Sequence, residues 1–195
     1  MPEQLVFQGF EPCPLPEPTD GLFLALVPPA ATANRIGELI QQLRYSHGLR
    51  GQPLSPSRLH VTLHYLGAYN GLPQKLVEVV CAAVPAVSMP PFEISFDRAL
   101  SFTNKRKTRP FVLRAGRDMV ALTTFHRALG GAMTRAGLGR VTPHCTPHMT
   151  LLYDRRLVDE HQIEALGWTV TDFVLVHSLV GRGKHIHLAR WPLQR

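Results

Sequence analysis

Two copies of a short motif, His-x-Thr, are the residues of this sequence best suited to chemistry. They are His60-Val61-Thr62 and His148-Met149-Thr150, and each lies in an apolar stretch whose pattern predicts a β-strand. Because side chains alternate along a strand, the histidine and the threonine of one copy share a face and lie about 7 Å apart. Each copy therefore predicts an imidazole that can transfer a proton beside a hydroxyl that can donate a hydrogen bond.

The pair exceeds what composition predicts. The chain has ten histidines, so roughly one His-x-Ser or His-x-Thr is expected by chance, yet three are present. The third, His144-Cys145-Thr146, is followed at once by a proline, which cannot donate in a strand ladder. The other two also share leucine at the fourth position and tyrosine at the sixth. We interpret them as one repeated motif; two unrelated strand histidines are the alternative.

Two such motifs facing one another suit the opening of a cyclic phosphodiester. One histidine would take a proton from water, and the other would protonate the leaving sugar oxygen. An unperturbed pKa of about 6.5 lets histidine serve in either role near neutral pH. Thr62 and Thr150 would hold the non-bridging oxygens and stabilise the charge of the transition state. This scheme needs no metal ion and no other cofactor, and none is expected.

Three further residues are candidates for substrate contact. His64 lies two residues after Thr62 and should share its face, although a histidine at the rim of the site would have the same spacing. Arg109 belongs to a basic cluster at residues 105–109, which suits RNA phosphates or a solvated loop. Phe102 precedes this cluster and could stack on a base or pack in the core.

Two other patterns favour structure over chemistry. His144 and His148 have the spacing of metal ligands on a helix, but the neighbouring prolines oppose a helix and no second ligand pair is evident. The sequence Gly-Arg-Gly-Lys at 181–184 lacks the spacing of a phosphate-binding loop and predicts a hairpin turn. No metal site is therefore expected. Three histidines flank the turn and are predicted to be structural: His177, His185 and His187.

The apolar pattern predicts an α+β fold. Strands and helices alternate in two passes, each with one His-x-Thr strand, which predicts two similar lobes. Residues 1–20 are expected to form an irregular N-terminal segment, and residues 21–195 a single two-lobed domain. Strands are expected over residues 21–29, 59–66, 92–100, 111–115, 148–153, 170–180 and 185–191, and helices over 30–45, 73–84, 119–136 and 158–166.

Composition places the chain among ordinary globular proteins. Apolar residues make up 45% and the net charge is +7. This charge favours nucleotides or RNA as partners, although an arginine-rich genome would give the same balance. Three scattered cysteines without a Cys-x-x-Cys pair indicate a reducing compartment, so a cytoplasmic location is expected. No apolar run approaches the roughly 20 residues of a membrane span, and we expect a monomer that binds no membrane.

The motifs resemble those of the 2H phosphoesterase superfamily, which is named for two His-x-Thr/Ser motifs. RLHVTLHYLG (58–67) is similar to its first motif and TPHMTL (146–151) to its second. LFLAL (22–26) and the segment 172–193 are similar to its opening strand and closing hairpin, so the resemblance covers most of the chain. Within the superfamily, the chain looks most like the bacterial RNA 2′,3′-cyclic phosphodiesterases, often labelled 2′-5′ RNA ligases.

This resemblance implies a cleft between two lobes related by a pseudo-twofold axis, with antiparallel sheets and with helices on the outside. It implies that His60 is the general acid and His148 the general base, with Thr62 and Thr150 completing the catalytic set and a 2′-phosphate as product. Many members carry arginine where this chain has Tyr153. We therefore expect Tyr153 to contact the substrate and to alter its choice.

The expected activity is metal-independent hydrolysis of 2′,3′-cyclic phosphate ends of RNA or nucleotides to a phosphomonoester. The same four residues would also serve hydrolysis of another cyclic nucleotide or nucleotide-sugar phosphate, or reversible 2′-5′ RNA joining. A nucleotide- or RNA-binding module without turnover is an alternative of another class. Loss of a histidine or threonine would favour that alternative, and both motifs are intact.

Overall fold

One antiparallel sheet organises the molecule. The computed structural model describes residues 17–103, 107–116, 119–139 and 146–194. No helix among these residues is long and apolar enough to cross a membrane. The elements in chain order are β1 (Asp20–Leu26), α1 (Ala30–Ser46), the 3-10 turn η1 (Pro56–Arg58), β2 (Val61–Tyr69), α2 (Gln74–Ala83), the 3-10 turn η2 (Val84–Ala86), β3 (Phe92–Ser101), β4 (Arg109–Arg114), α3 (Val120–Arg135), β5 (His148–Asp154), β6 (His161–Val170), β7 (Asp172–Leu179) and β8 (Lys184–Pro192).

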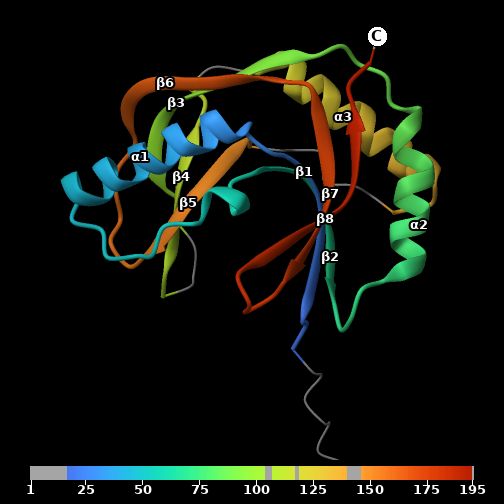
Figure 1. Cartoon of the computed structure of the whole chain (residues 1–195), viewed down its shortest axis with the longest axis horizontal. Helices are drawn as coiled ribbons and strands as arrows, with labels where there is room; N and C mark the ends of the chain where they lie inside the picture. Colours follow the sequence, from blue (N-terminus) through green and yellow to red (C-terminus); the bar gives the residue numbers. More distant parts are fainter. Residues whose placement is uncertain (1–16, 104–106, 117–118, 140–145, 195) are drawn as a thin grey trace, which may run out of the picture.

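The strands of the described chain form a single sheet in the order β6-β3-β4-β5-β2-β1-β7-β8 (Figure 1). The two motif strands, β2 and β5, meet in the middle through one register pair, Val61 with Met149. The expectation of more than one sheet is therefore wrong, because this contact joins the halves β2-β1-β7-β8 and β5-β4-β3-β6 into one sheet. The pseudo-twofold relation of the halves and the cleft between them stay predictions.

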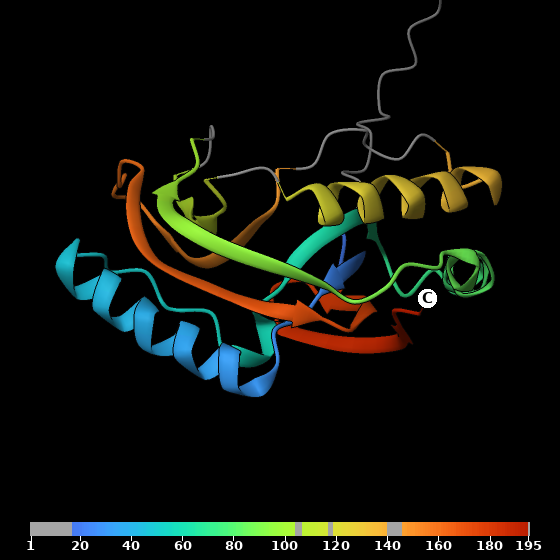
Figure 2. The same cartoon turned by 90° about the horizontal axis from the view of Figure 1, so that it is seen from above.

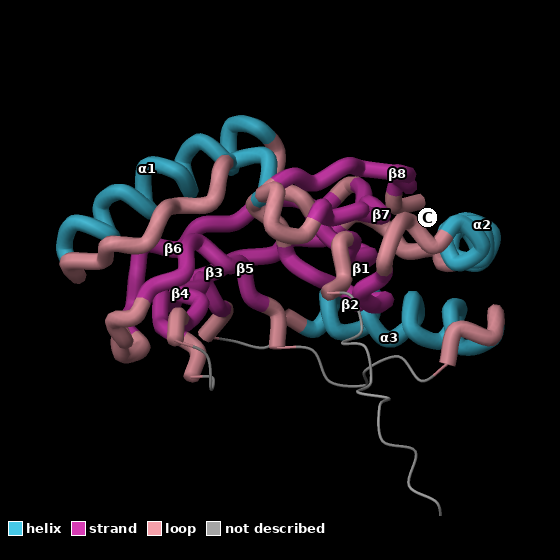
Figure 3. Tube along the Cα trace, turned by 90° about the horizontal axis from the view of Figure 1, so that it is seen from below, coloured by secondary structure: helices cyan, strands magenta, loops and turns pink. Residues whose placement is uncertain are grey.

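The helices pack on the sheet through apolar side chains along one of their faces. Ile36 and Ile40 lie one turn apart in α1 and are fully buried, and Phe125 and Leu129 do the same in α3. In Figures 1 and 2, α1 lies at one end of the molecule and the pair α2 and α3 at the other. Figure 3 shows the strands between them.

Strand β1 divides the apolar residues into two clusters. Leu24 belongs to the main core with the helices, whereas Phe23 and Ala25 join Val174 and Val176 of β7 in a small separate cluster. This division follows from the alternation of side chains along a strand. The small cluster marks the second face of the sheet, which becomes important for the two histidines.

A strand stands where the sequence predicts a short helix over residues 158–166. Here β6 pairs along β3, with Trp168 opposite Ile94. The segment HQIEAL contains good helix formers. It nevertheless forms a strand, because it supplies hydrogen bonds to the free edge of β3, and this pairing between distant segments overrides its local helix propensity. The predicted strand over 170–180 is also divided, since β6 and β7 are separated at Thr171.

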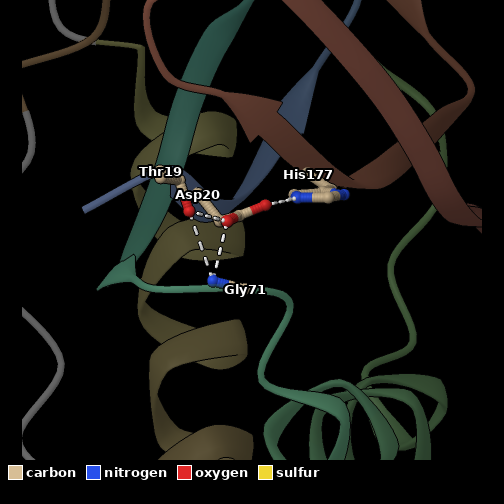
Figure 4. Close-up of polar contacts among 4 residues, drawn as sticks. All are labelled: Thr19, Asp20, Gly71 and His177. Carbon is tan, nitrogen blue, oxygen red and sulfur yellow. Dashed lines mark hydrogen bonds and ion pairs between the residues drawn. The ribbon is translucent and has the colours of Figure 1, made fainter.

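The buried carboxylate of Asp20 ties the start of β1 to its neighbours (Figure 4). Its oxygens accept hydrogen bonds from Nε2 of His177 in β7, from the hydroxyl of Thr19 (2.5 Å) and from the N–H of Gly71 after β2 (2.8 Å). The bonds from Thr19 and His177 are the main reason why the pKa of Asp20 lies below its ordinary value, although burial opposes them. One side chain therefore links three segments.

Candidate active site

The two histidines lie on neighbouring strands at the centre of the sheet. His60 directly precedes β2, His148 opens β5, and the middle residues of the two motifs pair with each other. In an antiparallel pair the flanking positions oppose one another, so His60 lies opposite Thr150 and Thr62 opposite His148. Both middle residues are buried. The four polar side chains therefore project together from the other face.

Each histidine is held by the same backbone contact. Nδ1 of His60 lies 2.7 Å from the carbonyl oxygen of Arg58, and Nδ1 of His148 lies 2.8 Å from that of Thr146. A carbonyl oxygen only accepts, so Nδ1–H donates in both rings. In the neutral ring, Nε2 is then left with its lone pair and can take a proton, and in the charged ring it can give one.

Aromatic rings fix the orientation of both imidazoles. Phe23 of β1 stacks on His60 with ring centroids 4.8 Å apart, and Phe102 meets His148 edge-on at 4.9 Å. His185 of β8 also meets His60 edge-on, at 5.2 Å. Phe102, predicted from the sequence as a possible base platform, thus lies beside a predicted catalytic ring.

A β-bulge follows the threonine of the first motif. Leu24 of β1 pairs with His64 and Ala25 pairs with Thr62, which leaves Leu63 without a partner. An extra residue of this kind shifts the alternation of the bulged strand by one. Because directly paired residues share a face, His64 lies with Leu24 in the main core and Thr62 lies with Ala25.

The second motif has a bulge at the same position. Val112 of β4 pairs with Thr150 and Phe111 pairs with Leu152, which leaves Leu151 without a register partner in β4. The two leucines at the fourth motif position, which the sequence shows as a shared feature, are therefore both bulge residues.

The bulges bring the shared tyrosines onto the threonine face. Tyr65 pairs with Phe23, which stacks on His60, and its exposed fraction is 60%. Tyr153 pairs with Pro110 and is 49% exposed. Regular alternation would have turned both tyrosines away, so the predicted contact of Tyr153 with substrate becomes geometrically possible only because of the bulge.

The matching patterns and this geometry agree with a known family. The family described as the 2′-5′ RNA ligase superfamily matches residues 28–182, which include both motifs and more than half of the chain. The chain belongs to the 2′-5′ RNA ligase superfamily.

Individual members of the superfamily are distant relatives. The RNA 2′,3′-cyclic phosphodiesterase of Escherichia coli (strain K12) is 26% identical over 178 residues, which cover 88% of this chain and 96% of that protein. The crystal structure of E. coli LigT complexed with NADP+ is 25% identical, covers 92% of this chain and 100% of its own, and has a TM-score of 0.71. E. coli LigT complexed with ATP is 26% identical with the same coverage and a TM-score of 0.69.

In this member of the superfamily, His64 does not share the face of Thr62, and the expectation that it does is wrong. It is 3% exposed, its Nε2 lies 2.9 Å from the carbonyl oxygen of His126, and the two rings stack at 4.0 Å. Burial lowers the pKa of His64 to about 4. The second motif could have indicated this burial, because Leu152, an ordinary core residue, occupies the position that His64 has in the first motif.

The structure does not bring Arg109 to the two histidines. It pairs with Asp154, one position beyond Tyr153 and therefore on the opposite face, and its guanidinium donates to the carbonyl of Arg155 (3.2 Å). Residues 104–106 of the basic cluster lie outside the described residues, so their predicted contact with RNA stays a prediction.

No metal site is evident in the described part of the chain. None of its His, Cys, Asp and Glu side chains form a group of three or more that could hold a metal ion. His144, whose spacing from His148 was weighed as a metal-ligand pattern and not favoured, lies outside the described residues.

The proximity of His185 to His60 was not predicted from the sequence. Its ring touches that of His60 and also meets Phe23 at 5.5 Å, while its structural role stays a prediction. Burial lowers its pKa to about 4, aided by the charges of His60 and Arg58. Burial is also the main cause that lowers the pKa of His60, and the nearby charges of His148, Arg58 and His187 add to it. In the sequence, the spacing of His185 and His187 indicated only that they share one face of a strand. It did not indicate which face of the sheet that is.

Proposed function

We propose that this protein hydrolyses 2′,3′-cyclic phosphate ends of RNA or nucleotides to a phosphomonoester without a metal ion. One observation carries the proposal: two His-x-Thr motifs pair through their middle residues, and each histidine is tied at Nδ1 to a backbone carbonyl. Two proton-transfer groups and two hydroxyls on one face are what this reaction requires. The relation to the E. coli RNA 2′,3′-cyclic phosphodiesterase supports the same chemistry.

In the proposed reaction, water attacks phosphorus and gives its proton to Nε2 of His148. The bond between phosphorus and the 3′-oxygen breaks, and Nε2 of His60 protonates that oxygen, which leaves a 2′-phosphate. Thr62 and Thr150 donate hydrogen bonds to the non-bridging oxygens, where negative charge grows. Proton exchange with solvent then restores both histidines.

The surroundings of His60 suit the acid role once a phosphate is bound. Burial and the charges of His148 and Arg58 lower the pKa of His60 in the protein alone. A phosphate anion beside the ring supplies an opposite charge, which raises this pKa and favours the protonated form. Substrate binding would therefore promote protonation of the group that must act as an acid.

The assay is incubation with the common nucleoside 2′,3′-cyclic monophosphates in excess EDTA, followed by separation of 2′- and 3′-monophosphates. We expect 2′-monophosphates, formed as fast as without chelator. A large loss of rate that zinc or magnesium restores would overturn metal independence. A 3′-phosphate product would overturn the assignment of the broken bond, and absence of turnover on every substrate would overturn the function itself.

A further inference from the structure

The guanidinium of Arg58 has an unused donor next to the candidate active site. Arg58 ends η1, and its carbonyl oxygen holds Nδ1 of His60. Its Nε is buried without a hydrogen-bond partner, and no carboxylate of the described residues forms an ion pair with it. A buried donor left unpaired costs about 1–3 kcal/mol. The Arg58 side chain therefore lacks both a hydrogen-bond acceptor for its Nε–H and a carboxylate to balance its charge.

This guanidinium lies against the turn that joins β7 to β8. One of its terminal nitrogens is 3.6 Å from the position that a Cβ on Gly183 would occupy. Its charge also acts on both His60 and His185, whose rings touch. Arg58 is thus a cation beside the histidine that is proposed to protonate the leaving sugar oxygen.

The turn adds a second cation. Arg182 precedes Gly183, is exposed, and forms no ion pair with any other described residue. Lys184 opens β8 one position before His185, so the alternation of side chains turns it to the face opposite to His60. Arg58 and Arg182 are therefore the two cations at this turn, and neither is paired with a carboxylate of the described residues.

We propose that Arg58 and Arg182 form a second anion site, which binds the phosphodiester preceding the cyclic phosphate of an RNA strand. The planar fork of arginine matches two phosphate oxygens and satisfies the unpaired Nε. Thr62 and Thr150 are proposed to bind the reacting phosphate, so these cations are available for the neighbouring phosphodiester of the RNA strand. The inference rests on the proposed function and assigns its substrate: an RNA end is preferred to a mononucleotide.

The test compares three adenosine substrates: the 2′,3′-cyclic monophosphate, its 5′-phosphorylated form, and the dinucleotide with a 2′,3′-cyclic end. In the wild-type protein, we expect kcat/KM to be about tenfold higher for the dinucleotide than for the unphosphorylated mononucleotide, and this preference should weaken with salt. Arg58→Gln, and separately Arg182→Gln, should each reduce the preference several-fold, whereas Lys184→Gln on the opposite face should leave it unchanged. A 5′-phosphorylated mononucleotide as good as the dinucleotide would mean a terminal phosphate site and overturn the diester assignment.

Arg35→Gln is the matched control. Arg35 is an exposed arginine of α1 that lies against β6, at the sheet edge opposite to β8. This variant should keep the wild-type preference. If Arg58→Gln lowers kcat/KM equally on all three substrates while it stays folded, Arg58 only positions His60 and the second site is refuted. Equal rates of the wild-type protein on all three substrates would also refute it and leave the proposed function standing, whereas no turnover on any would overturn both.

Discussion

His60 and His148 are held alike but surrounded differently. Each gives its Nδ1–H to the carbonyl two residues earlier, so both present Nε2. His60 also touches Phe23 and His185, whereas the ring contact of His148 is with Phe102. Equivalent motifs thus have unequal surroundings, which gives a physical basis for two different roles in one reaction.

Replacing either histidine should remove turnover without unfolding the protein. A general acid or base contributes about 10²–10⁴-fold, so kcat on a cyclic phosphate should fall by that factor in His60→Ala and in His148→Ala. Thr62→Val and Thr150→Val keep the shape but lose the hydroxyl, and should cost about 10–10³-fold. Circular dichroism checks the fold of each variant. Near-normal activity of a folded histidine variant would contradict the assignment.

A change of leaving group should separate the two histidines. A general acid matters most when the leaving oxygen is basic, and a nitrophenolate leaves with little protonation. His60→Ala should therefore be less impaired on a nitrophenyl ester of a nucleotide than on a cyclic phosphate. His148→Ala should be impaired on both, because water still needs its base. Steady-state rates on the two substrates decide this, and the reverse pattern would exchange the roles.

At the scale of elements, alternation along a strand was enough to predict the motif faces but not the bulges. Leu63 and Leu151 become unpaired only when β2 lies on β1 and β5 lies on β4. A single strand carries no information about that register. His64 was therefore predicted on the wrong face, and alternation alone would not have placed the tyrosines on the face of the threonines.

Distant pairing also explains the other differences from the sequence expectations. The segment 161–166 has helical propensity but completes the edge of β3. His185 reaches His60 because β8 pairs with β7 and β7 with β1, and Phe23 of β1 contacts both rings. The motif residues could be predicted because they repeat, whereas their neighbours depend on contacts between remote segments.

The hydrogen bonds of the Asp20 carboxylate should stabilise one half of the sheet without affecting catalysis. Asp20→Asn loses the negative charge to which His177 and Thr19 donate hydrogen bonds, so the free energy of unfolding should fall. The value of kcat/KM should stay the same, because Asp20 lies on the face of β1 opposite to Phe23. The pKa of Asp20 is held below its ordinary value of 3.8. Its contribution is therefore present above that pH and is lost as pH falls through the lower folded value.

Urea unfolding of the wild-type protein and of Asp20→Asn at several pH values measures this contribution. The difference between them should be largest near neutral pH and shrink in strong acid. Glu38→Gln, at an exposed position of α1, is the control and should match the wild-type protein throughout. A difference independent of pH would mean that shape, and not the carboxylate charge, carries the effect.

At the scale of the whole molecule, histidines that lose contact with solvent on folding couple the fold to pH. Burial is the main cause of a lowered pKa in each of six histidines. An unfolded chain keeps the ordinary value of about 6.5, so below that pH it binds more protons than the folded protein does. The sign follows directly: stability falls as pH decreases from about 6.5 towards 4. The six are His47, His60, His64, His126, His185 and His187.

The fall in stability should be smaller when His64 is replaced by leucine, the residue that the second motif has at this place. The pKa of His64 is lowered to about 4 and the side chain is 3% exposed, so its share is on the order of 3 kcal/mol by pH 4. Rising positive charge also destabilises a basic protein in acid, and it acts almost equally on the wild-type protein and on His64→Leu. Urea unfolding of both proteins between pH 7.5 and 4 therefore isolates the histidine. We expect their curves of unfolding free energy against pH to diverge below pH 6.5, with His64→Leu the shallower; parallel curves would mean that His64 is protonated in the folded protein as easily as in water.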